Sequence, residues 1–328
     1  MSDELAEVDR ATSAEDILAA LRSEAGANGF QHQLDPLHSV SFLARGPSLL
    51  VTFERTDDTL SLSETGLPIG LDFVEDKNWS LLHFTATSDS WFRSSAVYEF
   101  LDEMVDDAFF EDFDRVTFYG SGMGGYAAAA FSVVSPGATI IAISPQATLD
   151  VERTEWDDRF PAARRLVFDD RYGYAPDMIE GTGAAYILYD PHARLDAMHA
   201  SLFRGPNVTR LKCRFLQDHI AWSLNEMGLL HRIIEAAAGG ALPPHEFYRL
   251  LRARRNHARY LRNMLFHMDD LDDPYLMGLY CAHVLSRMSA PAFRRRLDLA
   301  KEALERDGAL PDWLASQPET GQSAESAD

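Results

Sequence analysis

The residues best suited to chemistry lie in segment 115–130, where a strand-like run leads through a glycine-rich turn into a helix-like run of small residues. Gly120 and Gly124 flank the turn, each two positions from its apex at Gly122. A sharp strand-to-helix turn of this kind presents its apex residue at the end of a sheet, where a serine can attack a carbonyl carbon. The nearby hydroxyl belongs to Ser121, one position before the apex. The segment therefore predicts the backbone of a nucleophile elbow with glycine at its apex.

The same segment resembles the α/β-hydrolase superfamily, in particular bacterial esterase-like proteins whose elbow is Y-G-x-S-M-G-G-Y. The resemblance covers about residues 40–238 and extends to Asp89-Ser-Trp91, to Ile143-Ser-Pro-Gln146 and to a late aspartate and histidine. In that family a serine directly precedes Met-Gly-Gly. Here Gly122 holds that position, and Ser121 stands one residue earlier.

A glycine has no side chain with which to attack a carbonyl, so the apex itself cannot carry out nucleophilic acyl transfer. The favoured hypothesis is a non-hydrolytic protein of α/β-hydrolase fold that binds a small molecule or a protein partner. The alternative is a serine esterase or acyl transferase in which a shifted turn recruits Ser121. A plain glycine turn that binds an anion, or nothing, also fits the residues.

Two further positions match the order of a hydrolase triad, in which an acid follows a late strand and a histidine follows the next strand. Asp190 and Asp196 come after the strand-like run 186–189, and His219 comes after the run 208–215. Asp190 is preferred as the acid because it stands directly at the strand end. A helix N-cap role would explain Asp196, and a helix-start role would explain His219, without catalysis.

The turn also predicts an anion-friendly corner built from the backbone. The amide of Met123 and the start of a helix near Gly124 supply partial positive charge. A second amide is expected near Glu54, after the strand-like run 49–53. Together with Gly120 and Gly122, these residues could hold a carboxylate or an ester without turning it over. No cofactor and no metal are expected.

Strand-like and helix-like runs alternate through the middle of the chain, which predicts a parallel or mostly parallel sheet with helices on both faces. With the resemblance, this gives an α/β-hydrolase-like domain over residues 38–238, preceded by a leader, 1–37, with one helix capped at Ser13. Expected strands are 40–44, 49–53, 81–85, 116–119, 139–144, 186–189 and 208–215; expected helices are 96–110, 124–134 and 220–238.

The character of the chain changes after Gly239-Gly240, and residues 241–313 follow an almost wholly helical pattern. Pro274 and Pro291 stand where they could begin helices 275–288 and 292–305. This pair resembles a tetratricopeptide hairpin, although such arrays normally need several copies. It raises a third hypothesis, a helical module that binds a protein partner or forms a homo-oligomer. Residues 314–328 are predicted to be a disordered tail.

Composition excludes several classes of function. The 328 residues include 30 basic and 51 acidic side chains, so the net charge is −21. Such a charge argues against nucleic acid and anionic membranes as partners, because polyanions would be repelled. Two cysteines exclude a disulfide framework and a zinc site made mainly of thiolates. The acidic N-terminal segment and the lack of a long apolar run predict a cytoplasmic protein.

Overall fold

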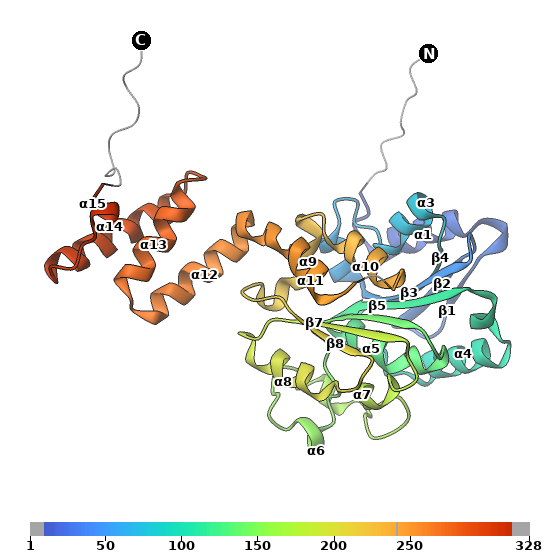
Figure 1. Cartoon of the computed structure of the whole chain (residues 1–328). Helices are drawn as coiled ribbons and strands as arrows, with labels where there is room; N and C mark the ends of the chain where they lie inside the picture. The colour runs from blue at the N-terminus through green and yellow to red at the C-terminus, as the bar shows by residue number, and fades with distance from the viewer. Residues whose placement is uncertain (1–9, 241, 317–328) are drawn as a thin grey trace, which may run out of the picture. The chain divides into compact units, whose positions relative to one another are not determined.

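The computed structural model describes residues 10–240 and 242–316, and the chain divides into two compact units between Ala253 and Arg254 (Figure 1). The sequence places this boundary earlier, between 238 and 241. The structure moves it because helix α11 (Pro244–Leu250) packs against the last strand of the sheet. The hydroxyl of Tyr248 accepts a hydrogen bond from the backbone N–H of Lys212 there, at 3.0 Å.

Within the described residues, the N-terminal unit is built on one eight-stranded sheet of order β1-β2-β4-β3-β5-β6-β7-β8. β2 is antiparallel to both β1 and β4, and the remaining neighbours are parallel. The strands are β1 (Phe30–Gln33), β2 (His38–Leu43), β3 (Ser48–Arg55), β4 (Ser80–Ala86), β5 (Arg115–Ser121), β6 (Thr139–Ile143), β7 (Ala184–Tyr189) and β8 (Val208–Lys212). This confirms the expected mostly parallel α/β architecture.

The N-terminal segment contributes more to the sheet than the sequence predicts. The expected helix is α1 (Ala14–Ala25), and the Oγ of Ser13 accepts from the amide of Asp16, as a capping residue does. The expected leader 1–37 also contains β1, which pairs with β2 from Phe30↔Phe42 to Gln33↔Ser39. Four alternating residues carry too weak an apolar pattern to be recognised before their partner strand is known.

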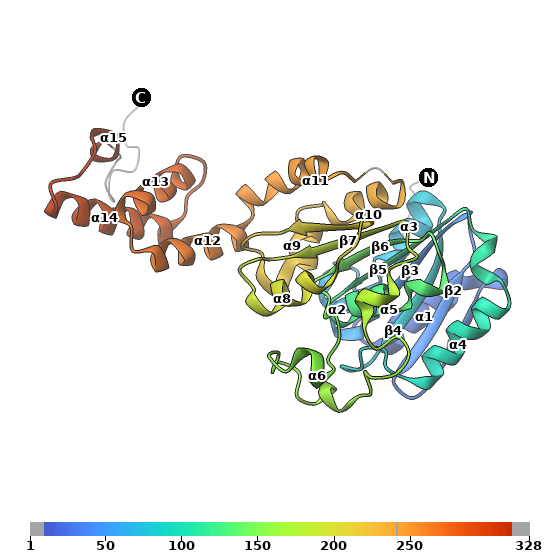
Figure 2. The same cartoon turned by 60° about the horizontal axis from the view of Figure 1, so that its bottom comes forward.

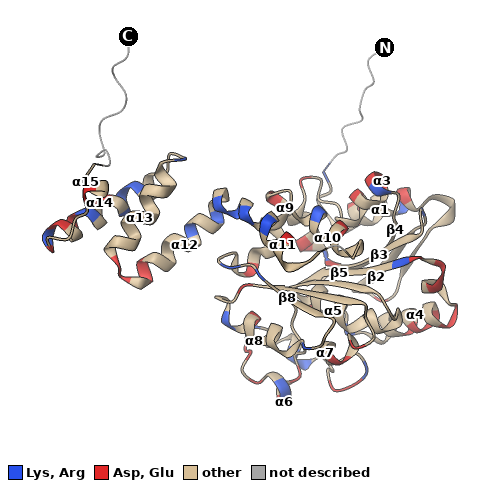
Figure 3. Cartoon of the chain, in the orientation of Figure 1, with Lys and Arg blue, Asp and Glu red and all other residues tan. Residues whose placement is uncertain are grey.

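Helices cover both faces of the sheet (Figure 2). Apolar residues of α4 and α5 belong to the core cluster on one face, together with those of α7 and α8. Helices α1, α3 and α10 contact the strands from the other face. The acidic face expected for 96–110 is present on α4 (Figure 3). The remaining helices of this unit are α2 (Thr56–Leu62), α3 (Gly70–Lys77), α4 (Ser95–Asp106), α5 (Met123–Phe131), α6 (Val151–Thr154), α7 (Ala175–Met178), α8 (Arg194–Leu202), α9 (Ile220–Glu226) and α10 (Leu230–Ala238).

One expected helix is divided in two. The pattern over 220–238 predicts a continuous helix, but α9 ends at Glu226 and α10 begins at Leu230. Gly228 lies between them with φ +64°, a backbone conformation that favours glycine and interrupts a right-handed helix.

The described part of the C-terminal unit is helical, with α12 (Ala258–Leu271), α13 (Pro274–Leu285), α14 (Pro291–Arg306) and α15 (Asp312–Ala315). Pro274 and Pro291 occupy first-turn positions, as expected, and α13 packs along α14. Leu314 is buried in this unit, and its side chain approaches Gly278 so closely that a Cβ there would lie 2.8 Å from it. The predicted disordered tail is therefore wrong at 314–316, and its remainder, 317–328, lies outside the described residues.

Candidate functional site

The turn between β5 and α5 has the backbone expected of the elbow. Gly122 lies at its apex with φ +56° and ψ −120°, and its N–H donates to the carbonyl of Ile143 at 2.8 Å. A Cβ placed on Gly122 would meet nothing within 4 Å. The apex thus opens onto free space, and the cost of a side chain there is the positive φ alone.

The flanking glycines are required by close backbone approach. A Cβ on Gly120 would lie 2.1 Å from the carbonyl oxygen of Gly124, and one on Gly124 would lie 2.0 Å from that of Phe53. Both distances are far inside van der Waals contact, and both opposing atoms are backbone. No side chain fits at Gly120 or Gly124, and this steric requirement explains the spacing of two residues on either side of Gly122.

A cavity of about 300 Å³ opens beside this apex, at the carboxyl ends of β3 and β5. Five of the residues singled out from the sequence line it, namely Glu54, Ser121, Gly122, Asp196 and His219. Aromatic residues are also part of the lining, namely Phe53, Tyr119, Phe160 and Trp222. The amide of Met123 lies in the first turn of α5, where helix amides have no acceptor within their own helix.

Sharing a cavity does not bring the expected triad into contact. In the described part of the chain, Ser121 makes no hydrogen bond to His219. The Nε2 of His219 lies 3.3 Å from Asp218, and both side chains are largely exposed. Asp190 is fully buried and accepts instead from the backbone amides of His192 (2.9 Å) and Gln217 (2.7 Å). The preferred acid therefore ties the loops after β7 and β8 together.

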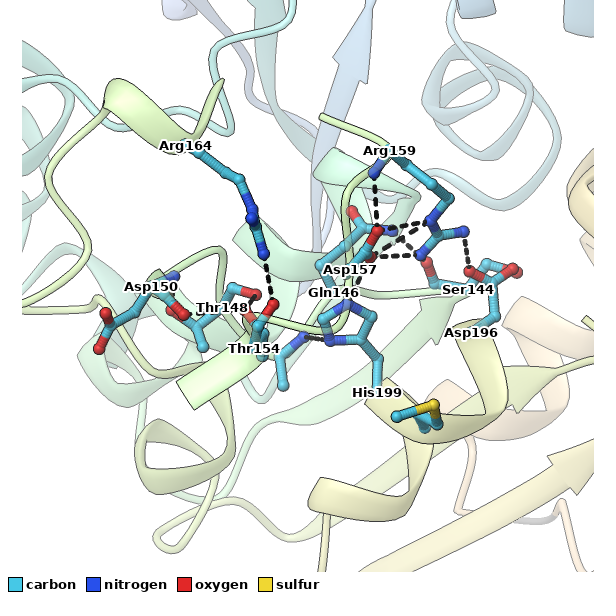
Figure 4. A network of polar contacts seen from close by, with 12 residues as sticks. Ser144, Gln146, Thr148, Asp150, Thr154, Asp157, Arg159, Arg164, Asp196 and His199 are labelled. Carbon is cyan, nitrogen blue, oxygen red and sulfur yellow. Dashed lines mark hydrogen bonds and ion pairs between the residues drawn. The ribbon is translucent and has the colours of Figure 1, made fainter. Parts of the chain in front are cut away.

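The rival acid, Asp196, binds a different partner. Its Oδ1 accepts from Arg159 at 2.6 Å, and Arg159 also makes a bidentate contact with Asp157 (Figure 4). Asp157 in turn accepts from the Nε2 of His199 at 2.8 Å, with both side chains fully buried. The Nδ1 of His199 accepts from the amide of Ala147, which fixes the proton on Nε2.

This network holds the segment after β6 over the cavity. Burial opposes ionisation of Asp157, but hydrogen bonds from His199 and Arg159 outweigh it and hold the pKa of that carboxyl well below its usual range. Asp157 thus stays ionised, and Arg159 binds both it and Asp196. The arrangement positions Arg159 in the cavity wall and pairs its guanidinium with two carboxyl groups of the protein.

Glu54 is the most unusual side chain in the cavity. It was expected to contribute a backbone amide, and in the structure Glu54 is one of the residues that line the cavity and is 7% exposed. Its Oε2 accepts from Thr59 at 3.0 Å, while its Oε1 is buried with no hydrogen-bond partner among the described residues. Burial raises the pKa of Glu54 to about 7, against the opposing effect of the Thr59 hydrogen bond.

A second cluster places a hydroxyl, an imidazole and a carboxylate in line, away from the elbow. The Nε2 of His38 lies 2.7 Å from the Oγ of Ser90, and its Nδ1 lies 2.8 Å from Asp35. Ser90 and His38 are only 4% and 2% exposed, and neither is among the residues that line the cavity. The cluster joins the loops before β2 and after β4, and Ser94 also donates to Asp35.

Several lining residues were missed as site residues. Ser144 and Gln146 belong to the Ile143–Gln146 run that carries the family resemblance, and Arg159 follows that run in the chain. Their place in or after that run was the signal in the sequence that could have identified these residues as part of the site. Nothing in the local sequence indicates that the side chain of Glu54 turns into the cavity. Among the described residues, no group of His, Cys, Asp and Glu is placed to hold a metal ion.

The strand order, the antiparallel second strand and the sharp turn between β5 and α5 are those of an α/β-hydrolase-like fold. No protein-family model matches the sequence, and no curated protein matches it. None of the helices in residues 10–240 and 242–316 has the length and apolar character needed to cross a bilayer.

Solved structures give distant similarities. The carboxylesterase EstE1, cloned from a metagenomic library, matches with TM-score 0.42 and 12% identity, over 69% of this chain and 93% of that one. Carboxyl esterase 2 of the fungus Tuber melanosporum matches with TM-score 0.39 and 11% identity, over 66% and 82%. The capsule O-acetyltransferase of Neisseria meningitidis serogroup A matches with TM-score 0.38 and 13% identity, over 58% and 90%.

Proposed function

We propose that this chain is a non-hydrolytic member of the α/β-hydrolase-like fold that binds a small molecule in the cavity beside Gly122. The observation that carries the proposal is the apex itself, which has the elbow backbone but no side chain. A ligand carbonyl at this point can accept a hydrogen bond from the amide of Met123 while no nucleophile attacks it. The hydrogen-bond partners of the other triad positions support the same conclusion, because Asp190 and Asp196 are both engaged elsewhere.

The alternative is a serine esterase or acyl transferase that uses Ser121 with His219 and Asp190 or Asp196. The location of Ser121 and His219 on the same cavity favours it. It requires the loop after β8 to rearrange, because the ring of His219 pairs with the exposed Asp218 in the described residues and not with Ser121, Asp190 or Asp196. A third hypothesis, a helical interaction module, draws support from the exposed apolar side chains of the C-terminal unit, such as Phe266 and Leu279.

Labelling with a fluorophosphonate probe, followed by peptide mapping, separates the first two hypotheses. The wild-type protein should not be labelled, and it should hydrolyse p-nitrophenyl acetate no faster than buffer. Covalent labelling at Ser121 that disappears in Ser121→Ala would instead establish the enzyme.

Gly122→Ser tests whether the apex is the missing element. It should fold, since a Cβ at this position meets nothing within 4 Å, at a cost of about 1–3 kcal/mol for the positive φ. Labelling at position 122 in this variant, with none in the wild type, is the expected pattern. Gly122→Ala is the matched control, because it bears the same backbone strain without a hydroxyl.

A further inference from the structure

The charges around the cavity are unevenly matched. Its two arginines are both already bound by carboxylates: Arg55 contacts Asp58 at 2.9 Å and Asp89 at 2.7 Å, and Arg159 contacts Asp157 and Asp196 as described above. Each guanidinium therefore faces two carboxylates. An incoming anion would have to displace one of them or meet uncompensated negative charge.

Glu54 adds a carboxyl group that has no cationic partner in the described residues. Its buried Oε1 accepts no hydrogen bond, and leaving a buried acceptor unsatisfied is costly. In the register of the sheet, Phe53 pairs with Gly120, so Glu54 and Ser121 are the next residues on neighbouring parallel strands. The unsatisfied carboxyl group thus lies at the same strand ends as the elbow.

Ser144 offers a second unsatisfied group in the same cavity. It is 9% exposed, its hydroxyl oxygen is buried without a partner among the described residues, and its φ of +46° is uncommon for a residue with a side chain. Two buried polar groups without partners in the described residues thus lie on residues that line one cavity, where a ligand could complete their hydrogen bonds.

We propose that the ligand is a small amine, whose N–H groups donate to the Oε1 of Glu54 and to the hydroxyl oxygen of Ser144. This inference rests on the proposed binding function of the cavity and specifies its ligand class. An ammonium group has three donors and no acceptor, so it fits a cavity whose arginines are already paired and in which the carboxyl group of Glu54 and the hydroxyl oxygen of Ser144 can accept hydrogen bonds. The aromatic wall formed by Phe160 and Trp222 suits an apolar or aromatic body attached to that amine.

Three probes with the same ring test the ligand class: 2-phenylethylamine, 2-phenylethanol and phenylacetate, with affinities measured by calorimetry at pH 8. We expect the amine to bind about tenfold or more tightly than phenylacetate, since a hydrogen bond to a charged group has this magnitude. Glu54→Gln should reduce amine affinity about tenfold or more. Ser144→Ala should reduce it to a smaller extent.

Asp58→Asn is the matched control. It removes one negative charge from the wall of the same cavity, but from a carboxylate that is largely exposed and already paired with Arg55. It should change amine affinity by less than about threefold, because exposed ion pairs contribute little. Equal losses in Glu54→Gln and Asp58→Asn would show a general charge effect and overturn the assignment to Glu54.

The remaining outcomes separate this inference from the function on which it rests. Phenylacetate binding in preference to the amine would leave the cavity as a binding site and refute the amine. Failure of all three probes to bind, in wild-type protein whose fold is verified by circular dichroism, would contradict both proposals.

Discussion

Replacing Glu54 by glutamine should change how the stability of the protein depends on pH. Burial holds the pKa of this carboxyl group at about 7 in the folded protein, compared with 4.5 for an ordinary glutamate. The fold therefore favours the protonated form. Its contribution to stability is present at low pH and is lost as pH rises from about 4.5 through about 7.

The size of the effect follows from the two pKa values. Their difference corresponds to about 3 kcal/mol of unfolding free energy, most of which is lost between pH 5 and pH 8. For a unit of this size, that loss lowers the melting temperature by about 5–10 °C. Glutamine keeps the shape and can accept from Thr59, but it does not ionise.

The assay is thermal unfolding of the wild type and Glu54→Gln from pH 5 to pH 8. Other groups titrate in this range in both proteins, so the measured quantity is the difference between their melting temperatures at each pH. The melting temperature of Glu54→Gln should rise relative to that of the wild type as pH increases. Glu64→Gln, which removes an exposed carboxylate, is the control and should follow the wild type. Parallel curves for the wild type and Glu54→Gln would refute the buried, unpartnered state of Glu54.

Two further predictions concern packing. Gly124→Ala should destabilise the protein by more than about 3 kcal/mol or prevent folding, because its Cβ would lie 2.0 Å from the carbonyl oxygen of Phe53. Gly122→Ala should cost only about 1–3 kcal/mol. Equal losses of stability for the two variants in urea unfolding would contradict the geometry of the turn. In the C-terminal unit, Leu297→Ala should cost about 2–5 kcal/mol because this side chain is fully buried, while Leu299→Ala, at a position 58% exposed, should leave unfolding almost unchanged. Indistinguishable unfolding curves for the two leucine variants would show that α14 does not bury the side chain of Leu297.

The sequence was sufficient to predict the sharp glycine turn between β5 and α5. Its geometry depends on contacts between residues close in the chain, so the spacing of Gly120, Gly122 and Gly124 is enough to indicate a sharp turn after a buried strand. Most strands were recognised for a similar reason, because each carries its own apolar run. β1 was missed because its four residues carry no such run, and only pairing with β2 makes them a strand.

Only the tertiary structure decided which side chains meet at the cavity. Glu54 and Ser121 are far apart in the chain and become neighbours through the register of β3 and β5. Asp190 and Asp196 were both candidate acids in the sequence, with Asp190 preferred, and each finds a different partner in the fold. Local sequence fixes a backbone turn through steric contact, whereas the partner of a polar side chain depends on segments that reach it only when the whole sheet has formed.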